Sequence, residues 1–293
     1  ILNASNRDWE DIDRDESDSY IGDFGNNNGT RRDLKIYKIS QSDYLDADDQ
    51  ANAEVIEFSY EDQTDFTSSP MDTNFDAEGL IAYGDFLYVF TKNWIDNRSH
   101  VYRIPKTVGT HVAVRFDELD TNGLVTGAAY NSLAGRVVLV GYDAFSPFLI
   151  EISDFSDEKF SSGVLTRYEL DVPIGDSFQI EAVTFTDQTR HVLSSEANFL
   201  GDAALMEIVL STLSLLELDK VETLIYPNPA KEKLWIDIQS GLKRVEIYDF
   251  NGKLILEKTP EFNSVDLGEL PKGHYLIRLY SDSGMTVKKL LRE

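Results

Sequence analysis

One hairpin pattern occurs four times in the sequence, and this repetition constrains the fold more than any other feature. Residues 76–94 read DAEGLIAYGDFLYVFTKNW. A short apolar strand (79–83), a Gly-Asp turn and an aromatic return strand (86–90) predict a β-hairpin there. Related segments span residues 9–27, 125–143 and 180–196. Further strand-like segments follow each copy, so we predict a repeat architecture.

The spacing of the copies divides the first part of the chain into strand units. Three units contain four predicted strands each, and a fourth unit, which begins at Ile180, contains three; the first three cover residues 1–60, 78–119 and 125–172. Repeated four-stranded antiparallel units are typical of a β-propeller. We therefore predict an all-β fold in which residues 1–212 form a propeller-like repeat domain of about five blades. A β-sandwich is the alternative, but it does not explain the in-phase hairpins.

The beginning of the chain predicts an incomplete blade. The first residue is Ile1, and the opening ILNA resembles the end of a strand. We expect residues 1–4 to be the outer strand of a truncated first blade, with its inner strands and a signal peptide upstream.

Composition excludes several classes of function. The 27 Lys and Arg residues face 52 Asp and Glu residues, which gives a formal charge of −25. This charge repels nucleic acid and anionic membranes, and no apolar run is long enough to span a bilayer. The chain has no Cys and four scattered His, so disulfides, thiolate sites and His-rich metal sites are not expected.

Alignment of the four hairpins produces two columns of polar residues at one end of the predicted sheets. The first column, at the starts of the first strands, contains Glu10, Glu78, Thr126 and Glu181. The second, near the ends of the return strands, contains Asp23, Thr91, Tyr142 and Glu196. Converging oxygen ligands suit Ca²⁺, and we predict a cation site at Glu10, Glu78, Glu181, Asp23 and Glu196. Two other interpretations stay open: acid–base catalysis by these carboxylates, or capping and hydrogen bonding between blades.

Aromatic residues near the same end allow a ligand platform. Trp9, Trp94 and Tyr142 could stack on a sugar ring, or could pack between blades. No Gly-x-Ser-x-Gly motif is present, so hydrolase triad chemistry has no support.

A second domain follows a predicted linker at residues 213–223. Residues 224–293 alternate short strands with Asn-Gly, Pro-Lys-Gly and Asp-Ser-Gly turns, which predicts a small Ig-like β-sandwich. Its motifs are YPNP (226–229), VEIYDFNGK ending at Lys253, VDLGELPKGHY (265–275) and a KKLL close ending at Leu291. In this order they resemble the type A C-terminal sorting domain of the type IX (Por) secretion system of Bacteroidetes.

That resemblance implies recognition by the type IX secretion machinery and a secreted or outer-membrane surface location. The residues that match the family's motifs, and that we expect to form the sorting signal, are Pro227, Asn228, Pro229, Gly252, Gly273, Tyr275, Lys288 and Lys289. His274 departs mildly from the hydrophobic residue or Tyr that the family has after the glycine.

The repeat domain resembles uncharacterised Bacteroidetes proteins through its DWEDI, YIGDFGNN and RDLKIYKI segments. The sequence DAEG at residues 76–79 is also loosely similar to calcium-dependent propeller hydrolases such as β-propeller phytases and gluconolactonases. We expect an extracellular binding or scaffold module with Ca²⁺ as its cofactor and a glycan or small molecule as its ligand. The alternative is a Ca²⁺-dependent hydrolase of phosphate esters, lactones or glycans.

Overall fold

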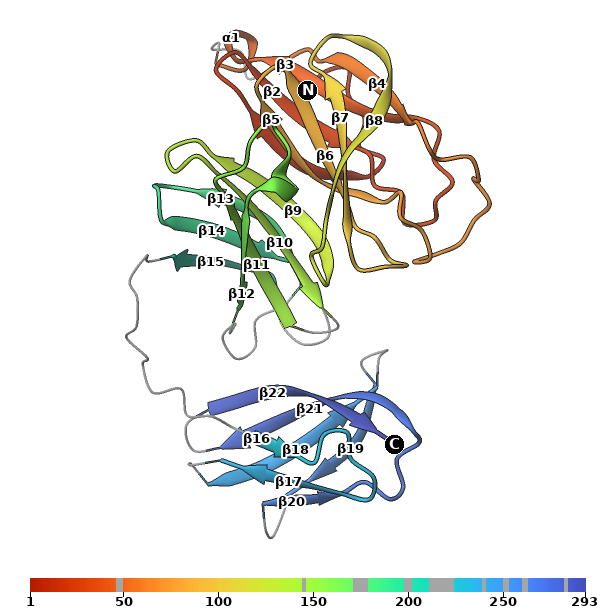
Figure 1. Ribbon diagram of the computed structural model, residues 1–293, viewed down its shortest axis with the longest axis vertical. Coiled ribbons are helices and arrows are strands. Elements are labelled where there is room, and N and C mark those ends of the chain that lie inside the picture. Colours follow the sequence, from red (N-terminus) through yellow and green to blue (C-terminus); the bar gives the residue numbers. More distant parts are fainter. Residues whose placement is uncertain are drawn as a thin grey trace. The chain divides into compact units, whose positions relative to one another are not determined.

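The computed structural model contains two compact units, each built almost entirely of β-strands (Figure 1). It describes residues 1–45, 50–143, 146–170, 179–197, 202–210, 224–238, 241–249, 253–259, 263–281 and 284–293. The predicted linker at 213–223 lies outside these ranges. No helix in the described ranges is long and apolar enough to span a membrane.

The first unit consists of antiparallel strand groups that follow the predicted hairpins. The first group contains β1 (Trp9–Arg14), β2 (Asp18–Asp23), β3 (Leu34–Ser40) and β4 (Glu54–Tyr60), with the short helix α1 (Gln41–Tyr44) after β3. The second contains β5 (Ala77–Tyr83), β6 (Phe86–Thr91), β7 (Ser99–Pro105) and β8 (Gly109–Leu119). The third contains β9 (Leu124–Asn131), β10 (Arg136–Asp143), β11 (Ser146–Ser153), the 3₁₀ turn η1 (Phe160–Ser162) and β12 (Val164–Glu169). The fourth contains β13 (Ile180–Phe185), β14 (Arg190–Ser195) and β15 (Ala204–Val209).

Local sequence explains the hairpins. In the second group Tyr83 pairs with Phe86, so Gly84 and Asp85 form a two-residue loop. Gly84 has φ of +55°, a left-handed conformation that glycine adopts without a steric penalty. Strands β5 and β6 are buried along nearly their whole length, which explains their continuous apolar runs.

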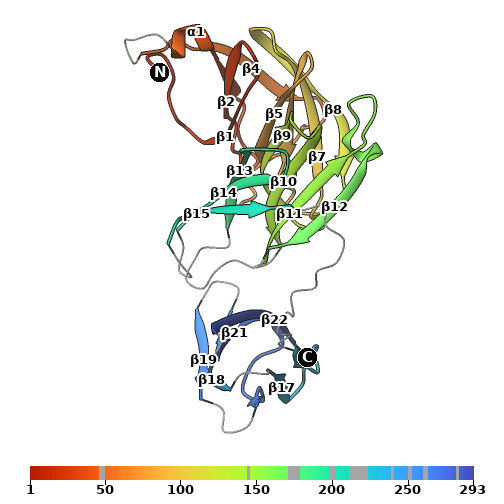
Figure 2. The same ribbon diagram turned by 90° about the vertical axis from the view of Figure 1, so that its left-hand side faces the viewer.

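The groups pack face to face. One core cluster lies between the first and second groups, a second between the second and third, and a third between the third and fourth. Aromatic rings fill the second cluster, where the Phe160 ring lies 5.1 Å from Tyr88 and 5.7 Å from Phe90. The first strand of each group is innermost: β5 packs against β1 and β9, and β9 packs against β13 (Figure 2). This all-β arrangement of blade-like groups is propeller-like.

Two sequence predictions need correction. The first and second groups are joined, because β4 pairs in parallel with the first half of β8 and produces an eight-stranded sheet. β8 is 11 residues long, and only its second half is needed to pair with β7. In addition, residues 1–4 form no strand of their own. Instead, Leu2 N donates to Ala51 O, and the Asn3 side chain exchanges two hydrogen bonds with the Ala53 backbone.

The second unit has two sheets around one core. One sheet contains β16 (Leu224–Tyr226), β17 (Lys233–Asp237) and β20 (Ser264–Asp266); the other contains β18 (Leu242–Tyr248), β19 (Leu254–Lys258), β21 (Gly273–Ser281) and β22 (Gly284–Arg292). Leu234 and Ile236 from the first sheet meet Val245, Ile277 and other apolar residues from the second. The alternation of buried and exposed residues along β17 matches this two-sheet packing.

Candidate functional site

The four residues of the first sequence column share one structural irregularity. In each innermost strand the pairing register shifts by one residue, and the extra, unpaired residue is Glu10, Glu78, Thr126 or Glu181. A β-bulge of this kind bends the strand and redirects the side chain of the extra residue. Four equivalent bulges therefore place four column residues at equivalent positions on neighbouring strands.

The bulges bring three carboxylates together. Glu78 is 4% exposed, its carboxyl group hydrogen-bonds that of Glu10, and it also experiences the charge of Glu181. Asp76, which is fully buried two residues before Glu78, adds a fourth carboxylate. We refer to Glu10, Asp76, Glu78 and Glu181 as the acidic mouth.

Lys92 lies at the centre of the acidic mouth. Its Nζ is 3.1 Å from Glu78 Oε1, and both side chains are almost completely buried. The ammonium group also lies 5.0 Å from the ring centre of Trp94 and 5.3 Å from that of Tyr142. These distances permit cation–π attraction, so Lys92 is held by one carboxylate and two aromatic rings.

The pKa values in the mouth follow from burial and crowding. Burial, together with the charges of Asp8 and Asp76, raises the pKa of Glu10 to about 8. Burial also raises the pKa of Glu181 to about 7, although Lys92 opposes this shift. Burial would lower the pKa of Lys92, but Glu78 and the other neighbouring acids raise it. Part of the acidic mouth is therefore protonated at neutral pH, with Lys92 charged.

Hydrogen bonds fix the residues around the mouth. Asp76 accepts from Asn26 N at 2.6 Å and from Trp94 Nε1 at 2.9 Å. The Glu10 carboxylate lies against Gly25, where a Cβ would come within 1.9 Å of Glu10 Oε1. Only glycine fits at residue 25 without moving Glu10.

The other predicted site residues have different surroundings. Asp23 is buried and pairs with Arg31 at 3.1 Å. Glu196 is exposed, and its charge raises the pKa of Glu181. Trp9 packs on Tyr37 with ring centres 6.0 Å apart, whereas Trp94 and Tyr142 flank Lys92. The structure thus brings Glu10, Glu78, Glu181, Trp94 and Tyr142 together, and it gives Asp23 and Trp9 other contacts.

Sequence reasoning missed Lys92, Asp76 and Asp11. Lys92 and Asp76 lie immediately outside the two strands of the hairpin that contains Glu78. The alternation of residues along a strand does not predict burial there, so the sequence does not indicate that these two charges are buried. The Asp11 carboxylate is buried between innermost strands, with Oδ2 accepting from Leu80 N at 2.8 Å and Ala128 N at 3.2 Å. Among the described residues, no group of three or more His or acidic side chains has the arrangement of a metal site.

In the second unit, the first and last sorting motifs form one structure. The Asn228 side chain donates to Lys289 O at 2.8 Å and accepts from Leu291 N at 2.9 Å. Ala230 N donates to Leu291 O, and Glu293 N donates to Ala230 O. The YPNP segment is therefore fixed to the backbone of the final strand, β22.

The remaining sorting-signal residues are distributed over the same unit. Gly273 begins β21, and the Tyr275 hydroxyl, two residues later, donates to Pro271 O at 2.9 Å. Pro227 and Pro229 flank Asn228 and are exposed, while Lys288 lies on β22. Gly252 lies outside the described residues.

Comparison with known proteins identifies this unit. Residues 224–293 match the Por_Secre_tail family, the secretion system C-terminal sorting domain. This part of the chain is a type IX sorting domain, as the motifs predicted, and it indicates secretion to the cell surface or the extracellular space. A comparison with curated protein sequences found no match.

Solved structures similar to the whole chain have low sequence identity. PorZ, an essential bacterial surface component of the type IX secretion system of Porphyromonas gingivalis, is 13% identical with a TM-score of 0.37; the match covers 99% of this chain and 39% of PorZ. An α-L-arabinofuranosidase from Clostridium thermocellum is 11% identical with a TM-score of 0.39, covering 99% of this chain and 95% of the enzyme. Apo AztD from Citrobacter koseri is 10% identical with a TM-score of 0.31, covering 99% and 74%.

Proposed function

We propose that residues 1–212 form an extracellular binding module that the sorting domain directs through the type IX secretion system. The module would be part of a propeller ring of about five blades, and the sorting domain an Ig-like sandwich. The observation that carries the binding interpretation is the state of Lys92, which is buried, charged and bonded to Glu78 at 3.1 Å. A buried ion pair of this kind rigidifies the strand ends and offers no free nucleophile or base.

The contacts of the histidines support binding over catalysis. His100 Nε2 contacts Arg115 and Glu118, His111 Nε2 bonds Thr107 O, and His191 Nε2 contacts Asn131. None of these four contacts of His100, His111 and His191 joins a histidine to a hydroxyl nucleophile.

Export and binding are tested separately. A reporter protein that carries a secretory signal peptide and residues 224–293 should reach the surface or medium of a host with a type IX system. The same reporter without residues 224–293 should stay in the periplasm, and its export would contradict the proposed route. For the module, we expect saturable ligand binding without product formation; turnover of the bound ligand would contradict the binding interpretation.

Calcium binding at the acidic mouth is a prediction that names specific carboxylate ligands. Glu10, Glu181 and Glu196 are the predicted ligands that make no ion pair with Lys92 or Arg31. The excess of carboxylates over Lys92 supports cation binding because neighbouring negative charges repel each other unless protons or a cation neutralise them. Ca²⁺ should then raise the melting temperature of the full chain saturably, and Glu181→Gln should weaken the response. An equal shift in both proteins would place any Ca²⁺ elsewhere.

A hydrolase is the second candidate, and one observation favours it. The hydrogen-bonded pair of Glu10 and Glu78 has raised pKa values, and a carboxylic acid that stays protonated at neutral pH can act as a general acid. Phosphate esters, lactones and glycans should be assayed with and without chelator. Turnover that disappears in Glu78→Gln would replace the binding interpretation with this one.

A further inference from the structure

A cavity of about 1,040 Å³ lies at the end of the innermost strands opposite the acidic mouth. The mouth residues lie at the starts of β1, β5 and β13, whereas the cavity is lined by residues from the ends of all four innermost strands. These include Arg14, Tyr83, Tyr130 and Phe185. A site where several strands of a rigid scaffold end is a common place for a ligand.

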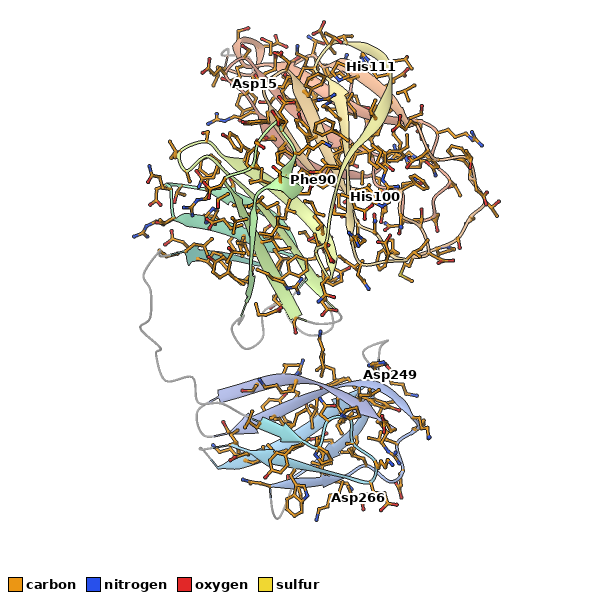
Figure 3. The ribbon with its side chains drawn as sticks, in the orientation of Figure 1. Asp15, Phe90, His100, His111, Asp249 and Asp266 are labelled. Atoms are coloured by element: carbon orange, nitrogen blue, oxygen red, sulfur yellow. The ribbon has the colours of Figure 1, made fainter. Side chains whose placement is uncertain are left out.

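A second cavity, of about 760 Å³, continues from the first. The two share Asp15, Glu16, Gly84 and Lys106, and the second extends to Phe86. Asp15 lies beside helix α1, as labelled in Figure 3, where Gln41 Nε2 donates to Asp15 O at 2.6 Å. We refer to the two cavities together as the far groove. Its two compartments suit an elongated ligand with repeating units.

Aromatic rings form part of the groove wall. Tyr83 and Tyr130 pack edge to face with ring centres 4.6 Å apart, and both are half-buried. Ile12 and Leu133 add apolar surface at the rim, with exposures of 62% and 55%. Such surfaces bind flat apolar faces, and the Tyr83 and Tyr130 side chains hydrogen-bond each other, which fixes the two rings in place.

The groove also presents charges of both signs. Lys106 Nζ bonds Asp15 Oδ2 at 2.9 Å, so these two charges compensate each other. Arg14 is exposed and makes no ion pair with any described residue, and Glu16 is likewise exposed. With Asp13 also in the wall, the groove offers both donors and acceptors but no excess positive charge. A polyanion is therefore disfavoured, more so on a chain of charge −25.

We propose that the far groove binds a neutral oligosaccharide, whose C–H faces pack on Tyr83, Tyr130 and Phe185 and whose hydroxyl groups bond Arg14, Asp13 and Glu16. A neutral sugar chain combines apolar faces with hydroxyl edges in each residue, which matches a groove lined by both aromatic rings and polar side chains. The assignment rests on the proposed binding function, but it does not involve the acidic mouth.

The test uses the full chain and isothermal titration calorimetry with cellohexaose, xylohexaose and mannohexaose. At least one should bind, with an affinity that is unchanged between 50 and 500 mM NaCl because no ionic contact is broken. Hexagalacturonate, an anionic hexasaccharide, should not bind. Arg14→Ala should weaken binding at least tenfold, and because Arg14 is exposed this change should leave folding intact. Tyr130→Ala, checked for folding by circular dichroism, should weaken it similarly.

The control variants separate this proposal from the general one. Arg32→Ala removes an exposed arginine outside the groove, so binding should be unchanged. If a neutral hexasaccharide binds but only Glu181→Gln weakens it, the module binds sugar at the acidic mouth and the groove assignment is wrong. Preference for hexagalacturonate, or failure of all three neutral probes, would overturn the proposed ligand class. Turnover of a probe would overturn the binding function itself.

Discussion

Replacement of Lys92 by methionine should destabilise the first unit strongly, and more so at high pH. At an effective dielectric constant of about 20, a separation of 3.1 Å corresponds to an attraction of about 5 kcal/mol between Lys92 and Glu78. Removing one partner of a buried pair costs about 3–5 kcal/mol because the other charge is left uncompensated. Glu78 can avoid this cost by binding a proton and becoming neutral. Above the ordinary glutamate pKa of 4.5, the free-energy cost of protonating Glu78 rises by about 1.4 kcal/mol for each pH unit. The expected loss is thus about 3–5 kcal/mol at pH 8 and about 1 kcal/mol at pH 5.5.

Urea unfolding of the full chain measures this loss. Trp94 lies 5.0 Å from the Lys92 ammonium, so tryptophan fluorescence reports on the region that changes. Lys35→Met removes a lysine of β3 that makes no ion pair with any described residue, and it should cost less than about 0.5 kcal/mol. The double variant Lys92→Met with Glu78→Gln should recover most of the stability, because Glu78, the carboxylate that loses its ion-pair partner, is then replaced by a neutral side chain. A loss below about 1 kcal/mol at pH 8, or a loss independent of pH, would refute this reasoning.

Three further outcomes follow from the contacts. The raised pKa values of Glu10 (about 8), Glu181 (about 7) and Asp13 (about 6) mean that the folded state holds more protons than the unfolded state. The unfolding free energy should therefore fall, by on the order of 7 kcal/mol, as pH rises from 5 to 8; a rise over this range in urea titrations would contradict this expectation. Gly25→Ala should cost about 1–3 kcal/mol in the same assay, because its Cβ would displace the Glu10 carboxylate, and an unchanged midpoint would show that Glu10 moves freely. Asn228→Ala should lower the stability of the sorting domain by about 1–2 kcal/mol, followed through Trp235 fluorescence, whereas no change would mean that the two hydrogen bonds to β22 contribute nothing.

The sequence predicted the innermost strands well because their signal is periodic. Hairpins of apolar residues closed by a Gly-Asp turn indicate strands wherever they occur, and Gly84 adopts the left-handed conformation that such a turn requires. Glu10, Glu78 and Glu181, which have equivalent positions in the aligned hairpins, also have equivalent positions in the structure, because each is the extra residue of an equivalent bulge.

Features that depend on pairing between distant segments were not accessible from the sequence. From the sequence alone, Lys92 is expected to lie in solvent at the end of a strand. In the structure, the close packing of its neighbours buries it beside Glu78. The parallel pairing of β4 with β8 similarly depends on where two blades meet, which no local pattern encodes. The sequence position of Trp9 predicted a place at the mouth, but in the structure its ring packs against Tyr37.

Asp11 connects three of the innermost strands by hydrogen bonds. Its carboxylate is buried among the innermost strands, with Oδ2 accepting from Leu80 N on β5 and Ala128 N on β9. The side chain thus links β1 to β5 and β9 and satisfies two backbone donors. Asp11→Ala should leave both donors unpaired at a cost of about 2–5 kcal/mol in urea unfolding, whereas Asp11→Asn keeps an acceptor oxygen and should cost less. Equal losses in the two variants would show that the charge of Asp11, and not its hydrogen bonds, holds the strands together.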